Sequence, residues 1–215
     1  MEGIMDALAT FFIIVPGFLL AVSFHECAHA LVATLLGDPT PSRMGRVSLN
    51  PLRHLDPLGT LCIFLFRIGW AKPVLFNPTN FYRPRLYSVM TAFAGPTSNF
   101  VLATILLFVL KWMTMPPLLL AMLLPVGAAK LLVEMLKVAI DLNVMLGVFN
   151  FLPIPPLDGS HLIAALIPRS WYRAWAALQR YMIFLLLVLL LLPGSQQGLN
   201  FLIKTVKGVL VSLVF

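Results

Sequence analysis

Charged side chains are scarce in this sequence. They make up 11% of its 215 residues, whereas soluble domains carry roughly 25%. Hydrophobic residues account for 60%, and the mean hydropathy is +0.95. This balance excludes a protein with a large water-exposed body. It predicts an integral membrane protein in which residues 1–215 form a single membrane domain.

Cysteine is also scarce. The two cysteines, Cys27 and Cys62, lie in apolar surroundings, and their spacing matches no disulfide framework. We therefore interpret both as small apolar residues. A cleavable signal peptide is not expected either, because no basic region precedes the first apolar run and no small-residue cleavage site follows it.

Acidic residues are few, with eight Asp and Glu against 15 Lys and Arg, which leaves a net charge of +7. The positive excess is concentrated in residues 37–86, where only Asp38 and Asp56 oppose it. The basic residues of this segment are Arg43, Arg46, Arg53, Arg67, Lys72, Arg83 and Arg85. Such clustering is typical of a cytoplasmic loop rather than of a nucleic-acid-binding surface. We expect a multi-pass protein of the cell membrane, with residues 37–86 in the cytoplasm, the N-terminus outside, and the lipid bilayer rather than nucleic acid as a partner.

Long apolar runs alternate with breaks that contain Pro and Gly. The runs at residues 4–36 and 87–113 are each long enough to cross a bilayer ~30 Å thick. Further apolar segments follow at residues 118–152, 182–192 and 199–215. The pattern predicts an all-α polytopic membrane protein, with a helical core of about three spans and extra C-terminal helices.

The segment 37–86 differs from these runs because Pro and Gly recur in it. Two short stretches, residues 45–51 and 70–78, have strand character. Residues 58–70 between them are apolar but too short to cross a bilayer, which is typical of a re-entrant or interfacial segment. We expect a small membrane-associated β element in this loop.

Charged residues recur at spacings of four, three and four in the third apolar run: Lys130, Glu134, Lys137 and Asp141. These spacings place them on one helical face. Two interpretations are open. The residues form either a polar stripe that faces headgroups or water and is held by its own ion pairs, or the wall of a water-filled access path.

Three ionisable residues, His25, Glu26 and His29, interrupt the first apolar run within the sequence HECAH. Ionisable side chains inside a membrane helix are costly, and they are usually paired or functional. A spacing of four places both imidazoles on one helical face, where they can bind one metal ion. Glu26 lies beside them. This arrangement is typical of a zinc hydrolase, in which two histidines bind Zn²⁺ and the glutamate takes a proton from water.

A catalytic zinc ion needs a third protein ligand. Asp158, within PPLDGSH, lies between two apolar segments, and Gly159 permits close approach of the backbone there. His161 and His54 are alternatives, since His161 is three residues past Asp158 and His54 lies in the basic loop. Local context favours Asp158.

Three motifs resemble those of the site-2 protease family of intramembrane zinc metalloproteases, and of its short bacterial branch in particular. They are HECAH at 25–29, AGPTSN at 94–99 and NFLPIPPLDG at 150–159. The loop segments GRVSLNPLRHLDPLGT and GWAKPV resemble the same branch. The resemblance covers residues 15–170 and does not extend to the PDZ-like or nucleotide-binding domains of larger members.

The resemblance implies roles for individual residues. It makes His25, His29 and Asp158 the ligands of one Zn²⁺ per chain, and Glu26 the general base. Asn150 is similar to the asparagine proposed to stabilise the oxyanion or to hold the substrate backbone.

The AGPTSN motif is similar to the segment whose small residues let its helix pack on the zinc-binding helix. Gly95 and Asn99 are four apart, which gives a small-and-polar face suited to close helix contact. Asn99 either supports a zinc ligand or serves packing alone.

The function implied by the resemblance is hydrolysis of peptide bonds within or near transmembrane segments, as in regulated intramembrane proteolysis, with a single-span protein as the expected substrate. The edge of the predicted β element would hold an unwound substrate by strand addition. Two other classes remain open: a membrane metal transporter that uses the same His/His/Asp site, and a catalytically silent relative that only binds membrane helices. A transporter has no need of a base beside its ligands, and the intact Glu26 argues against a silent relative.

Overall fold

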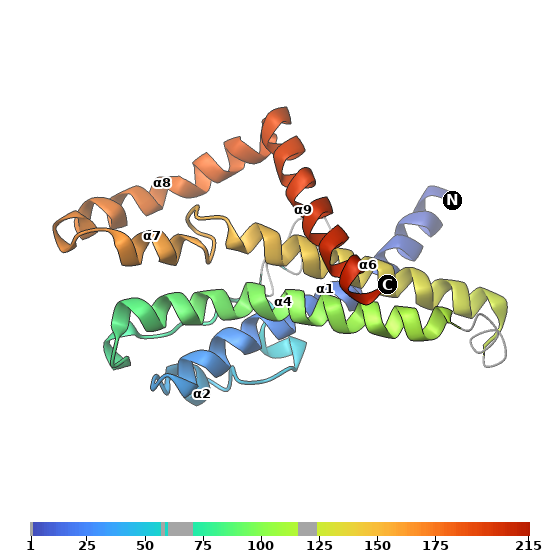
Figure 1. The fold of residues 1–215 in the computed structure, drawn as a ribbon, viewed down its shortest axis with the longest axis horizontal. Coiled ribbons are helices and arrows are strands. Elements are labelled where there is room, and N and C mark those ends of the chain that lie inside the picture. Colours follow the sequence, from blue (N-terminus) through green and yellow to red (C-terminus); the bar gives the residue numbers. More distant parts are fainter. Residues whose placement is uncertain (1, 57–58, 60–70, 116–123) are drawn as a thin grey trace.

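The computed structural model describes residues 2–56, 59, 71–115 and 124–215. This part of the chain is mainly helical (Figure 1). Three long helices contact one another and form the core: α1 (Glu2–Leu35), α4 (Pro84–Thr114) and α6 (Val126–Phe151). The C-terminal helices α8 (Tyr172–Leu191) and α9 (Pro193–Val214) meet at an angle, and α9 contacts both α4 and α6.

Short helical turns connect the long helices. The four-residue α2 (Thr40–Arg43) follows α1, and α7 (Ser160–Leu166) follows the loop after α6. Three single 3₁₀ turns lie elsewhere in the connections: η1 (Pro51–Arg53), η2 (Pro78–Asn80) and η3 (Arg169–Trp171).

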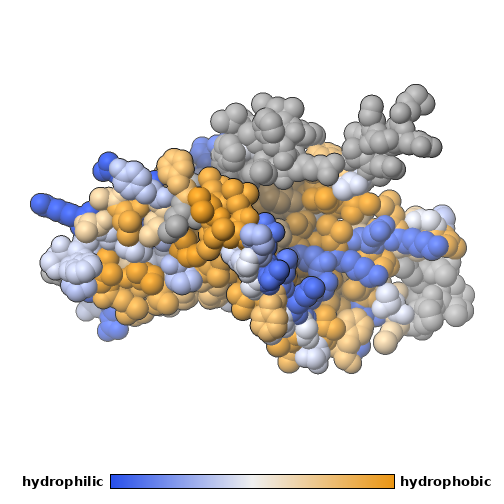
Figure 2. Space-filling view, turned by 90° about the horizontal axis from the view of Figure 1, so that it is seen from above, coloured by the Kyte–Doolittle hydropathy of each residue, from blue (hydrophilic) through white to orange (hydrophobic). Residues whose placement is uncertain are grey.

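Three helical segments are long and apolar enough to cross a membrane: Thr10–Leu35, Pro84–Thr114 and Pro193–Val214. Most of the described surface visible in Figure 2 is hydrophobic, which suits contact with lipid. The chain is therefore a multi-pass membrane protein with a mainly helical fold, as the sequence predicts. The core helix α6 is similar in length to these segments, but it is not one of the three because it carries the charged residues Lys130, Glu134, Lys137 and Asp141.

The predicted β element is wrong for the residues that the structure describes. Neither residues 45–51 nor the described part of 70–78 forms a strand. A single antiparallel bridge joins Leu55 to Ala71 instead. The predicted re-entrant segment, 58–70, lies almost entirely outside the described residues.

Two asparagines explain why the strands do not form. The side chain of Asn50 accepts a hydrogen bond from the N–H of Leu52, and that of Asn77 accepts one from the N–H of Thr79. In both places a 3₁₀ turn begins at the proline that follows the asparagine. Local side-chain hydrogen bonds and prolines thus prevent the backbone from pairing as strands, although the other residue types in these segments favour strands.

Glycines let the core helices approach one another. A β-carbon at Gly17 of α1 would lie 3.0 Å from Cα of Ala139 in α6, and one at Gly147 of α6 would lie 2.5 Å from the ring of Phe100 in α4. Small residues at such crossings allow backbones to pack closely in membrane proteins. The buried cluster around these contacts is aliphatic and includes Ile140 and Val144. Close packing therefore brings polar side chains on the three helices within reach of one another.

Polar contacts attach α9 to this core. Lys207 of α9 forms an ion pair with Asp141 of α6. Lys111 of α4 donates a hydrogen bond of 2.5 Å to the carbonyl oxygen of Val214, and its ammonium lies 5.5 Å from the ring centroid of Phe215. Asp141, at the end of the predicted stripe, is thus paired with another helix.

Candidate metal centre

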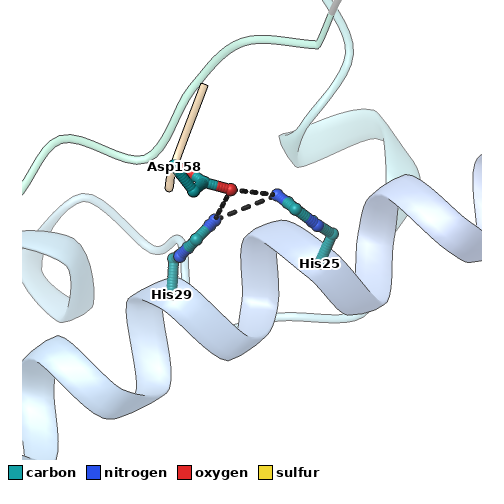
Figure 3. Close-up of side chains that lie close together, drawn as sticks. All are labelled: His25, His29 and Asp158. Atoms are coloured by element: carbon teal, nitrogen blue, oxygen red, sulfur yellow. Dashed lines mark hydrogen bonds and ion pairs between the residues drawn. The ribbon is translucent and has the colours of Figure 1, made fainter. Parts of the chain in front are cut away.

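His25 and His29 lie one turn apart on one face of α1, and Asp158 reaches them from the loop after α6 (Figure 3). The Nε2 atoms of His25 and His29 are 3.1 and 3.3 Å from Oδ2 of Asp158. The two Nε2 atoms are 3.0 Å apart. Three atoms of the kind that bind metals therefore converge from two distant parts of the chain.

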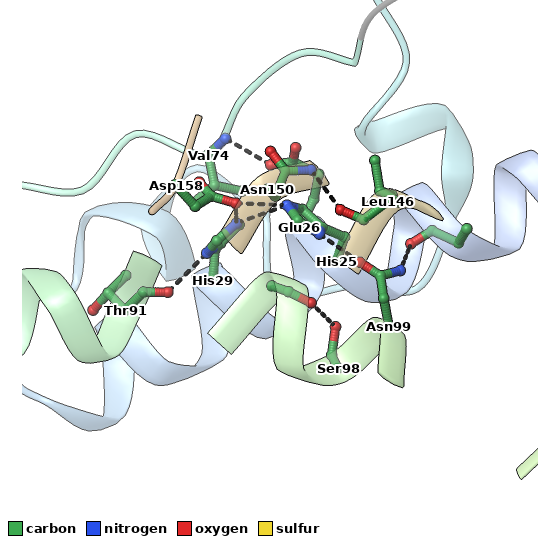
Figure 4. Close-up of polar contacts among 12 residues, drawn as sticks. His25, Glu26, His29, Val74, Thr91, Ser98, Asn99, Leu146, Asn150 and Asp158 are labelled. Atoms are coloured by element: carbon green, nitrogen blue, oxygen red, sulfur yellow. Dashed lines mark hydrogen bonds and ion pairs between the residues drawn. The ribbon is translucent and has the colours of Figure 1, made fainter. Parts of the chain in front are cut away.

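The second nitrogen of each ring determines its tautomer. Nδ1 of His25 donates to Oδ1 of Asn99 at 2.6 Å, and Nδ1 of His29 donates to the backbone carbonyl oxygen of Thr91 at 2.8 Å; both partners belong to α4 (Figure 4). Because each Nδ1 carries the ring proton, each Nε2 presents a lone pair toward Asp158. Buried partners of this kind also fix the orientation of ligand imidazoles.

Three acceptor atoms this close together repel one another unless a cation lies among them. Oδ2 of Asp158 is buried and has no hydrogen-bond donor among the described residues. A tetrahedral zinc ion, with bonds of about 2.0–2.1 Å, holds its ligand atoms about 3.3 Å apart. The separations of 3.0 to 3.3 Å found here are close to that value. The residues present therefore fit a zinc ion.

A tight turn after α6 carries Asp158 to the histidines. The N–H of Gly159 donates to the carbonyl oxygen of Asn150 at 2.8 Å. A β-carbon at Gly159 would lie 2.4 Å from the carbonyl oxygen of Phe151, so the turn can fold against the end of α6 only with glycine at this position.

Glu26 borders a cavity of about 450 Å³ that His25, His29 and Asp158 also line. The Glu26 side chain is oriented by the loop, because the N–H of Val74 donates a hydrogen bond of 2.9 Å to its Oε2 (Figure 4). The charged stripe of α6 does not contribute to the described lining of this cavity, which favours the polar-stripe interpretation over the access path.

Asn150 lines the same cavity from the end of α6. Its Nδ2 donates to the carbonyl oxygen of Leu146, one turn earlier, at 3.0 Å. The amide is therefore near the metal-binding group but bonded within its own helix.

Asp38 holds the segment that carries Val74. Its Oδ1 accepts hydrogen bonds from the N–H and hydroxyl of Thr40 at 3.0 and 2.6 Å and from Nδ2 of Asn80 at 2.6 Å, while its Oδ2 accepts from the N–H of Asn77 at 2.6 Å. Burial raises the pKa of Asp38, but these hydrogen bonds outweigh burial and place the pKa below its usual value. The carboxylate thus fastens the loop to the end of α1.

Neither alternative histidine joins the group. His54 is fully buried, and its Nε2 donates to the carbonyl oxygen of Ser48 at 2.7 Å. The ring of His161 lies 5.6 Å from that of Phe76, and burial lowers the pKa of His161. The described group of potential metal ligands consists of His25, His29 and Asp158.

Three groups around the site were not predicted from the sequence. The carbonyl of Thr91 and the N–H of Val74 act through the backbone, which no side-chain pattern reveals. Asn143 is different, because its amide lies between the charged stripe and the apolar residues 144–149 of α6 and is fully buried beside Asn99. An amide among apolar residues of a membrane protein is a signal that the sequence does contain.

A sequence model described as "Peptidase family M50" matches residues 11–192. The chain belongs to this family. A relative named as a zinc metalloprotease, YwhC of Bacillus subtilis (strain 168), is 40% identical over 176 residues, which cover 81% of this chain and 78% of YwhC.

Two further relatives, each named as a zinc metalloprotease Rip2, come from mycobacteria. The protein of Mycolicibacterium smegmatis is 28% identical over 195 residues, which cover 88% of this chain and 71% of the relative. The protein of Mycobacterium tuberculosis (strain ATCC 25618 / H37Rv) is 29% identical over 188 residues, which cover 85% of this chain and 68% of the relative. No solved structure matches this chain.

Membership of M50, the site-2 protease family, confirms the resemblance found in the sequence. This chain is a membrane metalloprotease, and its cofactor is zinc.

Proposed function

We propose that this protease cleaves peptide bonds within or next to transmembrane segments, with His25, His29 and Asp158 as the ligands of one zinc ion and Glu26 as the general base. The observation that carries the proposal is the convergence of two imidazole lone pairs and a donor-free carboxylate oxygen on one wall of the cavity that Glu26 also lines. A transporter site would not require Glu26, and no observation favours that alternative.

The depth of the site supports cleavage inside the bilayer. His25 lies ten residues before Leu35, the last residue of α1. At a rise of ~1.5 Å per residue this corresponds to about 15 Å along the helix axis, which is about half the thickness of the hydrocarbon core. Water would reach Glu26 through the cavity, because a general base at that depth must have a water molecule from which to take a proton.

Zinc bound at this site would polarise the scissile carbonyl and make water a stronger nucleophile. The chain's own groups prepare that chemistry. Asn99 and the Thr91 carbonyl keep the two imidazole lone pairs turned toward the site. Within the described part of the chain the N–H of Val74 bonds to Oε2 of Glu26, so Oε1 would take a proton from water and pass it to the leaving amine.

Asn150 would act at the developing oxyanion. One proton of its amide donates to the Leu146 carbonyl, and the second would donate to the substrate oxygen.

The substrate class follows from the membrane setting. A transmembrane helix hides its carbonyl groups in hydrogen bonds, so a substrate must unwind locally before attack. Strand addition to a sheet edge is not proposed, because the described loop forms no sheet. A single-span model substrate tests the idea. A Gly pair at the cleavage site should speed its hydrolysis, because unwinding then costs less, and unchanged or slower cleavage with normal binding would count against it.

Metal analysis and proteolysis of purified variants together test the function. We expect one Zn²⁺ per chain in the unmodified protein and a reduced content in His25→Ala, His29→Ala and Asp158→Ala. Glu26→Gln should retain zinc and lose proteolysis. His161→Ala is the matched control, because this histidine lies outside the converging group. Full zinc in Asp158→Ala, with loss in His161→Ala or His54→Ala, would overturn the ligand assignment.

A further inference from the structure

Asn143 is a fully buried amide in the middle of α6, and both ends of its side chain are bonded. Its Nδ2 donates to the carbonyl oxygen of Ala139, one turn earlier in the same helix, at 2.8 Å. Its Oδ1 accepts a hydrogen bond of 2.9 Å from Nδ2 of Asn99 in α4. Because the Ala139 carbonyl can only accept, the orientation of the Asn143 amide is determined.

This orientation determines that of Asn99. Nδ2 of Asn99 donates one hydrogen bond to Oδ1 of Asn143 and another, of 3.0 Å, to the carbonyl oxygen of Ala21 in α1. Both amide protons are then used, so Oδ1 of Asn99 faces Nδ1 of His25 as an acceptor. The hydrogen bonds therefore run in one direction, from Asn99 to Asn143 and from His25 to Asn99.

We propose that Asn143 is a positioning residue that acts through Asn99 to hold His25 in the tautomer with its lone pair on Nε2. The inference rests on the proposed function, in which His25 is a zinc ligand. It assigns to α6 a role at the metal centre besides that of leading into the loop that carries Asp158.

The physical reason is the cost of the alternative amide orientation. With Asn143 in place, a flipped Asn99 would direct its NH₂ at the Nδ1–H of His25 and its oxygen at two acceptors, all inside a buried core. An apolar side chain at 143 removes one of those two acceptors. The flipped amide then becomes accessible, and it favours the imidazole tautomer that carries its proton on Nε2, where it cannot bind zinc.

The test is zinc affinity, measured by competition with a chelator on the purified full chain. Asn143→Leu keeps the branched shape of the side chain and removes the acceptor. Asn143→Ser keeps a small hydroxyl on α6 but cannot reach Asn99, so it serves if leucine prevents folding. Either variant should bind zinc more weakly, by up to about 10–100-fold, which is the loss usual when the direct partner of a ligand is removed. The Co²⁺-substituted protein should show an altered visible spectrum.

Two comparisons separate positioning from packing. Ile140→Ala removes a buried side chain from the same helix without touching the hydrogen bonds, so it should lower thermal stability and leave zinc affinity unchanged. In an Asn99→Ala background, Asn143→Leu should have no additional effect on zinc affinity, because the two residues act in series.

The inference and the proposed function fail in different ways. If His25→Ala loses zinc while the Asn143 variants bind zinc like the unmodified protein, the positioning role is wrong and the ligand assignment stands. Additive losses in the Asn99 and Asn143 variants would also contradict it. If His25→Ala retains full affinity, the ligand assignment itself is wrong.

Discussion

Gly95 of α4 lies directly against the imidazole of His29 in α1. A β-carbon at position 95 would be 2.3 Å from Nε2 of His29 and 2.8 Å from Cε1 of His25. The two proposed zinc ligands thus occupy space that exists only because residue 95 has no side chain. The AGPTSN motif therefore shapes the metal centre as well as the packing of α4 on α1.

Gly95→Ala should consequently lower the zinc content, because the methyl group displaces the His29 ring from its position. We expect loss of most of the bound zinc and of proteolytic activity, measured by metal analysis of the purified protein. Gly127→Ala in α6 is the matched control, since a β-carbon there meets nothing within 4 Å. If Gly95→Ala retained full zinc and activity, the close packing described here would be wrong.

Val74→Pro should impair catalysis without releasing zinc. Proline lacks the N–H that donates to Glu26, so the carboxylate loses its orienting partner. We expect turnover to fall by about 10–100-fold, as for other small displacements of a catalytic group. Val74→Ala keeps the N–H and should fall much less. Equal losses in the two variants would indicate that the valine side chain, rather than its N–H, is what matters.

Asp38→Asn should destabilise the protein in a pH-dependent manner. The pKa of Asp38 is lowered by folding, so its contribution is fully present above the unfolded-state pKa of about 3.9 and is lost as pH falls through the lower folded-state value. At neutral pH the variant should unfold at a lower temperature, by an amount corresponding to about 2 kcal/mol. The difference between the two proteins should shrink below about pH 4.

Thermal unfolding in detergent from pH 3 to 7 provides the measurement for Asp38. Both proteins are compared without zinc, because acid also releases zinc by protonating histidine ligands. A difference that stays constant across this range would show that the charge of Asp38 is not the source of the stability.

Asn150→Ala should lower turnover by about 10²–10³, the usual cost of losing an oxyanion donor, while leaving the zinc content unchanged. The measurement is the rate of cleavage of a single-span substrate at saturating concentration. Normal turnover would assign Asn150 to packing, in line with its present hydrogen bond to Leu146.

Residues 37–86 should be accessible from the cytoplasm. Ser42 and Thr79 are exposed in this loop, so single cysteines placed there in a variant lacking Cys27 and Cys62 should react with an impermeant thiol reagent only in inverted vesicles. Reaction in intact cells would reverse the proposed orientation.

Local sequence patterns predicted the helices well and the loop poorly. The long apolar runs became α1, α4 and the C-terminal helices, because a chain in lipid must satisfy its backbone within each segment. The strand-like runs failed because Asn50 and Asn77 form local hydrogen bonds that compete with a ladder.

The sequence by itself determined the membrane class and the pairing of His25 with His29, since a spacing of four places two side chains on one helical face wherever the helix lies. It also contained the motifs that define the family. Only the tertiary structure decided that Asp158, rather than His54 or His161, lies beside that pair. It likewise decided that Thr91, Val74 and Asn143 surround the site. These groups come from separate segments, and their distances depend on how closely glycines allow the helices to pack, which no local pattern encodes.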